Sequence, residues 1–209
     1  HIIKVDSLGN EEWNRPFGVD EYIYSQTEAS MELPDKGFLT VGSFKGDSSA
    51  FVWGHGPYLI RTDSTGSPIW DTIIGDTSKI EWGYRIIAAT DTTAILFSNV
   101  KDSTSTLKYR LKVYKIDHSG KVITSAVYDN NKYTFGNSLL RTSDGKYIIC
   151  GSREISSTNY DIYTLKLNEA LLPDSLYSFS LTYDSLCGIA IVDSSFDLNC
   201  DSSIVICNT

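Results

Sequence analysis

The sequence lacks the features expected of membrane-spanning, helical or nucleic-acid-binding proteins. No apolar run approaches the eighteen residues needed to span a membrane, and no stretch has a convincing helical period. The net charge is −8, and the Lys and Arg residues are scattered along the chain. We therefore expect no membrane span and no nucleic-acid surface.

Recognisable catalytic and cofactor motifs are also missing. Residues 42–46 place their serine at the wrong position for a nucleophile elbow, and no phosphate loop, dinucleotide fingerprint or EF-hand occurs. The three histidines, His1, His55 and His118, have no H-x-x-x-H spacing, and an exposed place in its turn is the simplest account of His118. Carboxylates are plentiful, but none can be paired as acid and base. The sequence thus predicts no cofactor, no metal site and no enzymatic activity.

What the chain does contain is a repeat. Residues 2–13 (IIKVDSLGNEEW), 59–70 (LIRTDSTGSPIW) and 112–123 (KVYKIDHSGKVI) each carry an apolar strand into an Asp-x-x-Gly turn. The turn begins at Asp6, Asp63 and Asp117 in the three copies, and Asn168 begins the turn of a fourth, decayed copy. Successive first residues are 57, 54 and 51 positions apart. A second recurring aspartate, which opens an apolar stretch in each copy, has nearly the same period: Asp35, Asp91 and Asp144 are 56 and 53 positions apart. Repeats of this size indicate an architecture and say little about chemistry.

Each period reads as four short strands, because apolar and aromatic residues alternate over short runs that end at Gly, Asp, Asn or Ser. In the second copy we expect strands near 58–62, 68–74, 84–89 and 93–98. Asp-x-x-Gly is explained as a hairpin turn, whereas a calcium site would need six to eight oxygens, more than one such turn supplies.

The predicted fold class is therefore all-β, a β-propeller of four-stranded antiparallel blades, with a solenoid of stacked sheets as the competitor. About three and a half blades are expected within residues 1–186, followed by a Cys-containing tail over 187–209. The predicted repeats lie near 1–57, 58–111, 112–162 and, in degraded form, 163–186. Trp13 and Trp70 both follow their turn aspartate by seven residues, which predicts an equivalent packing place between blades; Thr124 takes that position in the third copy.

Units such as KVDSLGNEEW…DKGFLTVGS and RTSDGKYIICGS resemble the propeller repeats of secreted and surface proteins of the Bacteroidetes, many of which end in a type IX secretion sorting domain. The stretch over 172–201 resembles the segment that follows the last blade in such proteins. The resemblance implies an extracellular or outer-membrane-surface location and specifies no activity. We expect the C-terminal part of a longer propeller, whose remaining blades come from the rest of the chain or from another chain.

The four cysteines allow two interpretations. Cys150 lies in an alternating apolar strand, which favours a buried free thiol. Cys187, Cys200 and Cys207 crowd the end of the sequence without metal-site or redox-motif spacing. In an exported protein we expect a Cys187–Cys200 disulfide, with Cys200–Cys207 as the alternative.

Aromatic residues in the loops suggest one candidate binding site. In a propeller, the loops between the second and third strands of a blade and those between blades gather on one rim. The aromatic and imidazole residues of those loops are Trp53, His55, Tyr22, Trp82 and Tyr133, and flat aromatic faces suit sugars or peptides. The simpler alternative is that Trp82 and Phe135 cap the blade core.

The leading functional hypothesis is a non-enzymatic extracellular module that binds a protein or glycan partner at the loop rim or takes part in a surface assembly. One alternative is a propeller hydrolase or lyase with carboxylates from different blades at the channel mouth and one raised pKa. Another is a purely structural subunit with no well-formed pocket.

Overall fold

The computed structural model describes residues 1–17, 24–45, 56–77, 79–101, 109–128, 133–156 and 159–174. Within these ranges the chain is all-β, and none of the described residues forms a helix that could cross a membrane. The strands are β1 (Ile2–Val5), β2 (Glu11–Arg15), β3 (Tyr24–Glu32), β4 (Phe38–Lys45), β5 (Pro57–Thr62), β6 (Pro68–Ile73), β7 (Ile80–Ala88), β8 (Thr93–Lys101), β9 (Tyr109–Asp117), β10 (Val122–Tyr128), β11 (Thr134–Arg141), β12 (Tyr147–Ser156) and β13 (Asn159–Leu167).

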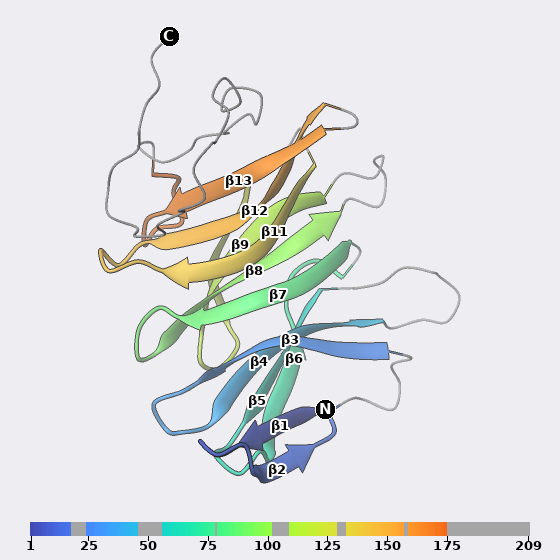
Figure 1. Cartoon of the computed structure of the whole chain (residues 1–209), viewed down its shortest axis with the longest axis vertical. Helices are drawn as coiled ribbons and strands as arrows, with labels where there is room; N and C mark the ends of the chain where they lie inside the picture. Colours follow the sequence, from blue (N-terminus) through green and yellow to red (C-terminus); the bar gives the residue numbers. More distant parts are fainter. Residues whose placement is uncertain are drawn as a thin grey trace, which may run out of the picture.

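These strands form four antiparallel sheets, in which each strand pairs with the next one along the chain. Sheet I is β1–β2, sheet II is β3–β4–β5–β6, sheet III is β7–β8–β9–β10 and sheet IV is β11–β12–β13. The sheets follow one another along the long axis of the molecule, from the blue N-terminal hairpin to orange β13 (Figure 1). The predicted all-β class and the antiparallel sheets are confirmed; the described strands do not close into a ring.

Sequence repeats and sheets have the same length but are offset by two strands. The repeat near 58–111 supplies β5 and β6 to sheet II and β7 and β8 to sheet III. The reason is that the Asp-x-x-Gly turn joins the last two strands of a sheet, whereas the connection after β6 crosses to the next sheet. The first hairpins of sheets II, III and IV also share a register shift at equivalent places: Thr27/Ala29, Gly83/Arg85 and Gly136/Ser138.

The repeated turn has the same hydrogen bonds at all four places. Asp63 Oδ1 accepts the backbone N–H groups of Thr65 and Ser67 at 2.8 and 2.9 Å, and the Asp63 N–H donates to the Ser67 carbonyl. Asp6 and Asp117 make the same bonds, and in the fourth turn Asn168 makes them with its amide oxygen. Each aspartate carboxylate accepts hydrogen bonds from backbone N–H groups of its own turn. These residues therefore stabilise hairpin turns, as predicted.

Trp13 and Trp70 each pack on the turn of the following repeat. A Cβ added to Gly66 would lie 2.7 Å from the Trp13 ring, and one added to Gly120 would lie 2.9 Å from the Trp70 ring. The predicted equivalent packing of the two tryptophans is therefore confirmed. In the third copy Trp is replaced by Thr124, and the matching turn carries Leu171 instead of glycine. Leu171 keeps the left-handed backbone (φ 60°) and is 2% exposed.

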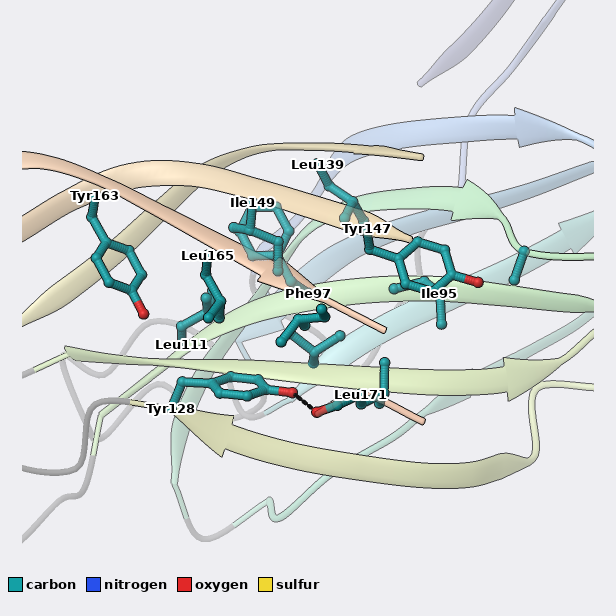
Figure 2. Packing of buried hydrophobic residues seen from close by; sticks show 13 residues of the cluster. Ile95, Phe97, Leu111, Tyr128, Leu139, Tyr147, Ile149, Tyr163, Leu165 and Leu171 are labelled. Carbon is teal, nitrogen blue, oxygen red and sulfur yellow. Dashed lines mark hydrogen bonds between the residues drawn. The ribbon is translucent and has the colours of Figure 1, made fainter. Parts of the chain in front are cut away.

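Sheet III lies between sheets II and IV and is covered on both faces. Ala94 and Leu96 of β8 belong to the apolar cluster shared with sheet II, whereas Ile95 and Phe97 belong to the cluster shared with sheet IV. All four side chains are fully buried, which explains a nearly continuous apolar run instead of a half-buried alternation. Figure 2 shows the second cluster, in which the Tyr128 hydroxyl donates to the Leu171 carbonyl at 2.5 Å.

Several sequence-based predictions fall outside the described residues. These include the tail over 187–209 and the disulfide between Cys187 and Cys200. Cys150, on β12, is a free thiol and is half-buried.

Candidate binding site

Six aromatic side chains meet where sheets III and IV adjoin. We call this cluster the aromatic patch: Trp82, Tyr84, Tyr109, Tyr133, Phe135 and Tyr160. Tyr84 lies in the middle of β7, and the other five residues lie within the first three positions of β7, β9, β11 and β13 or, for Tyr133, directly before β11. In an antiparallel sheet alternate strands begin at the same end, so the first positions of β7 and β9, and those of β11 and β13, gather at one end of their sheets.

The rings of the aromatic patch form a continuous row. The Tyr109 centroid lies 5.1 Å from that of Trp82 and 5.4 Å from that of Tyr133. Tyr133 in turn lies 5.3 Å from Tyr160. The Tyr109–Tyr133 and Tyr133–Tyr160 pairs are edge to face, with interplanar angles of 86° and 80°. This geometry is favoured by the ring quadrupoles and fixes the rings relative to one another.

The inner end of the aromatic patch is anchored in the core. Phe135 contacts Tyr84 at 5.2 Å in a perpendicular arrangement, and Tyr84 lies parallel to the fully buried Phe97 at 6.1 Å. Phe135 and Tyr84 are themselves half-buried. The prediction that Phe135 caps the core therefore fits its position, while the row beyond it reaches the surface.

The outer rings of the patch remain accessible and keep their polar tips available. Tyr160 is 51% exposed, and Trp82, Tyr109 and Tyr133 are half-buried. Burial raises the pKa of the Tyr109 and Tyr133 hydroxyls, so both remain protonated donors at neutral pH. None of the three tyrosine hydroxyls, nor the Trp82 indole N–H, is hydrogen-bonded to another residue within the described ranges.

Charged groups frame the aromatic patch on two sides. The Lys101 ammonium lies 5.8 Å from the centre of the Tyr109 ring. Glu154 holds Tyr133 in place, because its Oε2 accepts the Tyr133 N–H at 3.2 Å and its own N–H donates to the Tyr133 carbonyl at 2.8 Å. The backbone at the start of β11 is thus fixed by β12.

Only part of the predicted rim site falls within the described residues. Trp82 and Tyr133 both contact Tyr109, so the structure brings these two predicted residues together. Trp53, His55 and Tyr22 lie outside the described ranges. Sequence reasoning missed Tyr109 and Tyr160; the available signal was that each stands at the first or second position of a strand, beside the same rim.

Apart from the aromatic patch, a cluster of polar side chains lies inside the core between sheets II and III. Glu81 is fully buried, and its Oε1 accepts hydrogen bonds from the hydroxyls of Ser98 and Tyr114, the latter at 2.5 Å. The Lys112 ammonium lies 3.4 Å from Oε2. Burial first, and the Glu81 charge second, raise the pKa of Tyr114 far above its usual value. Gly75 covers this cluster, since a Cβ there would lie 2.5 Å from the Tyr114 hydroxyl. Glu81, Ser98 and Tyr114 are therefore closed off from solvent, whereas the Lys112 side chain is 15% exposed.

Asn99 links sheet III to sheet IV through a paired contact. Its side-chain N–H donates to the Gly136 carbonyl at 3.0 Å, and its Oδ1 accepts the Gly136 N–H at 2.8 Å. The Asn99 side chain is fully buried. It satisfies both backbone groups of a residue at a register shift of the neighbouring sheet.

The described carboxylates with a shifted pKa are held in turns or ion pairs. Their pKa values are all lowered, because hydrogen bonds and nearby ammonium groups favour the charged form. No set of three or more His, Cys, Asp or Glu side chains suited to a metal occurs among the described residues. His118 is half-buried instead of exposed, because its turn packs against sheet II; burial, followed by the nearby Arg61 charge, lowers its pKa.

Comparisons with known proteins give little further information. No protein-family model matches the chain, and no curated protein matches it in sequence. Among solved structures, the crystal structure of a subtype N11 neuraminidase-like protein of A/flat-faced bat/Peru/033/2010 (H18N11) matches with a TM-score of 0.38 and 12% identity. The match covers 74% of this chain and 53% of that one, so this chain spans about half of that protein's length. A similarity at this level implies neither a ligand nor an activity for this chain.

Proposed function

We propose that this protein is a non-enzymatic β-propeller module that binds a partner through the aromatic patch. The observation that carries the proposal is a surface row of tyrosine and tryptophan rings with free polar tips, held in a fixed arrangement by two packed sheets. Tyr and Trp are the residues most enriched at binding hot spots, because they combine a large apolar area with one polar group.

The propeller part of the proposal rests on the sheets themselves. Consecutive antiparallel sheets of three or four strands pack face to face, and equivalent turns recur in each of them. Exposed apolar side chains remain on both outer sheets, with Ile3 55% exposed on sheet I and Ile162 72% exposed on sheet IV. These faces suit further blades, which would come from the rest of the protein or from another chain. The Bacteroidetes-like repeats support an extracellular or outer-membrane-surface location.

The proposal is tested with the full chain on peptide and glycan arrays, comparing the wild type with Tyr160→Ala. Tyr160 is suitable because it is half exposed, so its truncation leaves the core intact. We expect bound features on an array whose signal falls by about tenfold or more in the variant. Ile69→Ala serves as the matched control, because Ile69 is 57% exposed on β6, outside the patch. Binding that is equal in the wild type and Tyr160→Ala would contradict the proposed site.

A further inference from the structure

Sheet I contains two strands of an arrangement that has four strands in sheets II and III. Its turn at Asp6 corresponds to the turns that follow β5 and β9, the third strands of those sheets. β5 pairs with β4 and β6, and β9 pairs with β8 and β10, whereas β1 pairs within the described residues only with β2. The other edge of β1 therefore lies where a second strand adds in sheets II and III. A strand edge of this kind is a template for pairing with another segment.

One face of sheet I is also uncovered. Ile3 and Val5, which lie three residues and one residue before the turn, are 55% and 52% exposed. At these two positions in sheets II, III and IV every side chain is at most 3% exposed: Ile60, Thr62, Tyr114, Ile116, Leu165 and Leu167. In sheets III and IV these side chains belong to the apolar cluster shared with the preceding sheet. By the same packing, a further sheet would cover Ile3 and Val5.

Sheet IV has the matching uncovered face at the other end of the molecule. Ile162, six residues before the Asn168 turn, is 72% exposed. Leu111 has the same position in sheet III and is fully buried in the cluster shared with sheet IV. Sheets I and IV lie at opposite ends of the long axis, so their uncovered faces do not meet within one copy (Figure 1). Between two copies, sheet IV is placed to pack on sheet I as sheet III packs on sheet IV.

The sequence beyond the described strands contains a segment that resembles the second strand of a sheet. Residues 201–209 (DSSIVICNT) resemble residues 144–152 (DGKYIICGS), which form the end of a turn and the first part of β12. Asp201 follows Asp144 by 57 positions, which is also the step between the first two hairpin turns. The segment therefore has the sequence pattern and the spacing of the strand that β1 lacks.

The register of the other sheets predicts how this segment would pair with β1. In sheets II, III and IV, the residue three positions after the recurring aspartate lies opposite the residue just before the hairpin turn: Phe38 and Thr62, Ala94 and Ile116, Tyr147 and Leu167. The same register on sheet I puts Ile204 opposite Val5 and Cys207 opposite Ile2.

We propose that this chain assembles head to tail with a second copy: sheet IV of one copy packs on sheet I of the next, and residues 201–209 of the first copy pair with β1 of the next. One interface then covers both Ile162 and Ile3 and pairs the second edge of β1. Because the two surfaces differ, the contact is heterologous, and it either closes into a ring or grows into a filament. The inference is separate from the proposed binding function. Tyr160 has the position of Tyr109, which stays half-buried where sheets III and IV adjoin.

A cysteine substitution in β1 tests the register directly. Residues opposite each other in an antiparallel pair have Cα atoms about 4.5–5.5 Å apart, a distance that a disulfide bridges. The full chain with Ile2→Cys, treated with oxidised glutathione, is therefore expected to form a covalent species of at least two 23.2 kDa chains. Peptide mapping should find position 2 joined to Cys207. Ile3→Cys is the matched control: its register partner is Ile206, so this disulfide should not form, and the wild type gives the background from its native cysteines.

Mixing two variants tests the head-to-tail geometry. Ile3→Glu and Ile162→Glu each place a charge on one of the two surfaces, and both side chains are exposed, so the fold is retained. In size-exclusion chromatography with light scattering, the wild type should associate, and each variant alone should associate about tenfold or more weakly. An equimolar mixture should recover a dimer, because one variant keeps its sheet IV surface and the other keeps its sheet I surface. Ile69→Glu, on β6 and 57% exposed, should associate like the wild type.

The results that would overturn the inference are distinct. A disulfide between position 2 and Cys207 in a species that migrates as one chain would show that each copy's own segment pairs with its β1. A wild type that stays monomeric, or a mixture no more associated than the two variants alone, would contradict the head-to-tail contact. None of these results bears on the aromatic patch, whose test uses Tyr160.

Discussion

At the scale of single residues, the buried Glu81 carboxylate shows how this core accommodates a charge. Its oxygens are met by two hydroxyls and one ammonium, all from the strands of sheet III. A buried charge is tolerated only when it is paired and hydrogen-bonded. Ser98, Lys112 and Tyr114 lie on the same face of sheet III as Glu81. The cluster therefore follows from the alternation of side chains along three neighbouring strands.

Replacing Glu81 with Ala is expected to destabilise the protein by about 3–5 kcal/mol, because the largely buried Lys112 ammonium would lose its counter-charge and two hydroxyls would lose their acceptor. Urea-induced unfolding of the wild type and the variant measures the effect. Glu11→Ala is the control: Glu11 is exposed on β2, and its truncation should change stability by less than about 0.5 kcal/mol. A cost for Glu81→Ala as small as that of the control would contradict the account.

At the scale of elements, the repeated hairpin turn was predictable from sequence because its interactions are local. Asp63, Thr65 and Ser67 lie within five residues, so spacing alone determines their hydrogen bonds. The boundaries of the sheets were not predictable in the same way. Whether the chain continues in one sheet after β6 or crosses to the next depends on packing between sheets, which the period does not reveal.

Two glycines of this turn provide a matched test of packing between repeats. Gly9 and Gly66 have nearly equal positive φ angles of 85° and 80°. A Cβ on Gly9 would meet nothing within 4 Å, whereas one on Gly66 would overlap the Trp13 ring. Gly9→Ala should therefore cost only the backbone strain of about 1–2 kcal/mol. Gly66→Ala should cost about 1–3 kcal/mol more, because Trp13 must move.

Chemical denaturation of both glycine variants provides the comparison. Equal losses of stability in Gly9→Ala and Gly66→Ala would show that Trp13 packing on the next turn contributes nothing. That result would contradict the account of how one repeat is fixed to the next.

At the scale of the whole molecule, the aromatic patch arises only when sheets III and IV come together. Trp82 and Tyr133 were predicted from their places next to rim loops, but the sequence does not show that Tyr109 lies between them. Residues 82 and 133 are separated by a full repeat, and their proximity depends on the face-to-face packing of two sheets. Tyr160 was missed for the same reason.

The paired contact of Asn99 with Gly136 joins sheets III and IV in addition to their shared apolar cluster. Asn99→Leu should destabilise the protein by about 2–5 kcal/mol, since it leaves a buried N–H and a buried carbonyl without partners. Thermal or urea unfolding measures the loss, and Asn14→Leu on the small sheet I is the comparison, because its contact with His1 is exposed. If Asn99→Leu were as stable as the wild type, the paired contact would not hold the two sheets together.

The most direct test of the central claim is the change in tyrosine ring signals of the ¹³C-labelled full chain when a ligand identified on the peptide and glycan arrays is added. The account predicts shifts in Tyr109, Tyr133 and Tyr160, with no change in Tyr114 and Tyr128, which are buried in the two cores. Shifts that avoid the aromatic patch, or no shifts at ligand concentrations that saturate binding, would contradict the claim that these rings bind the partner.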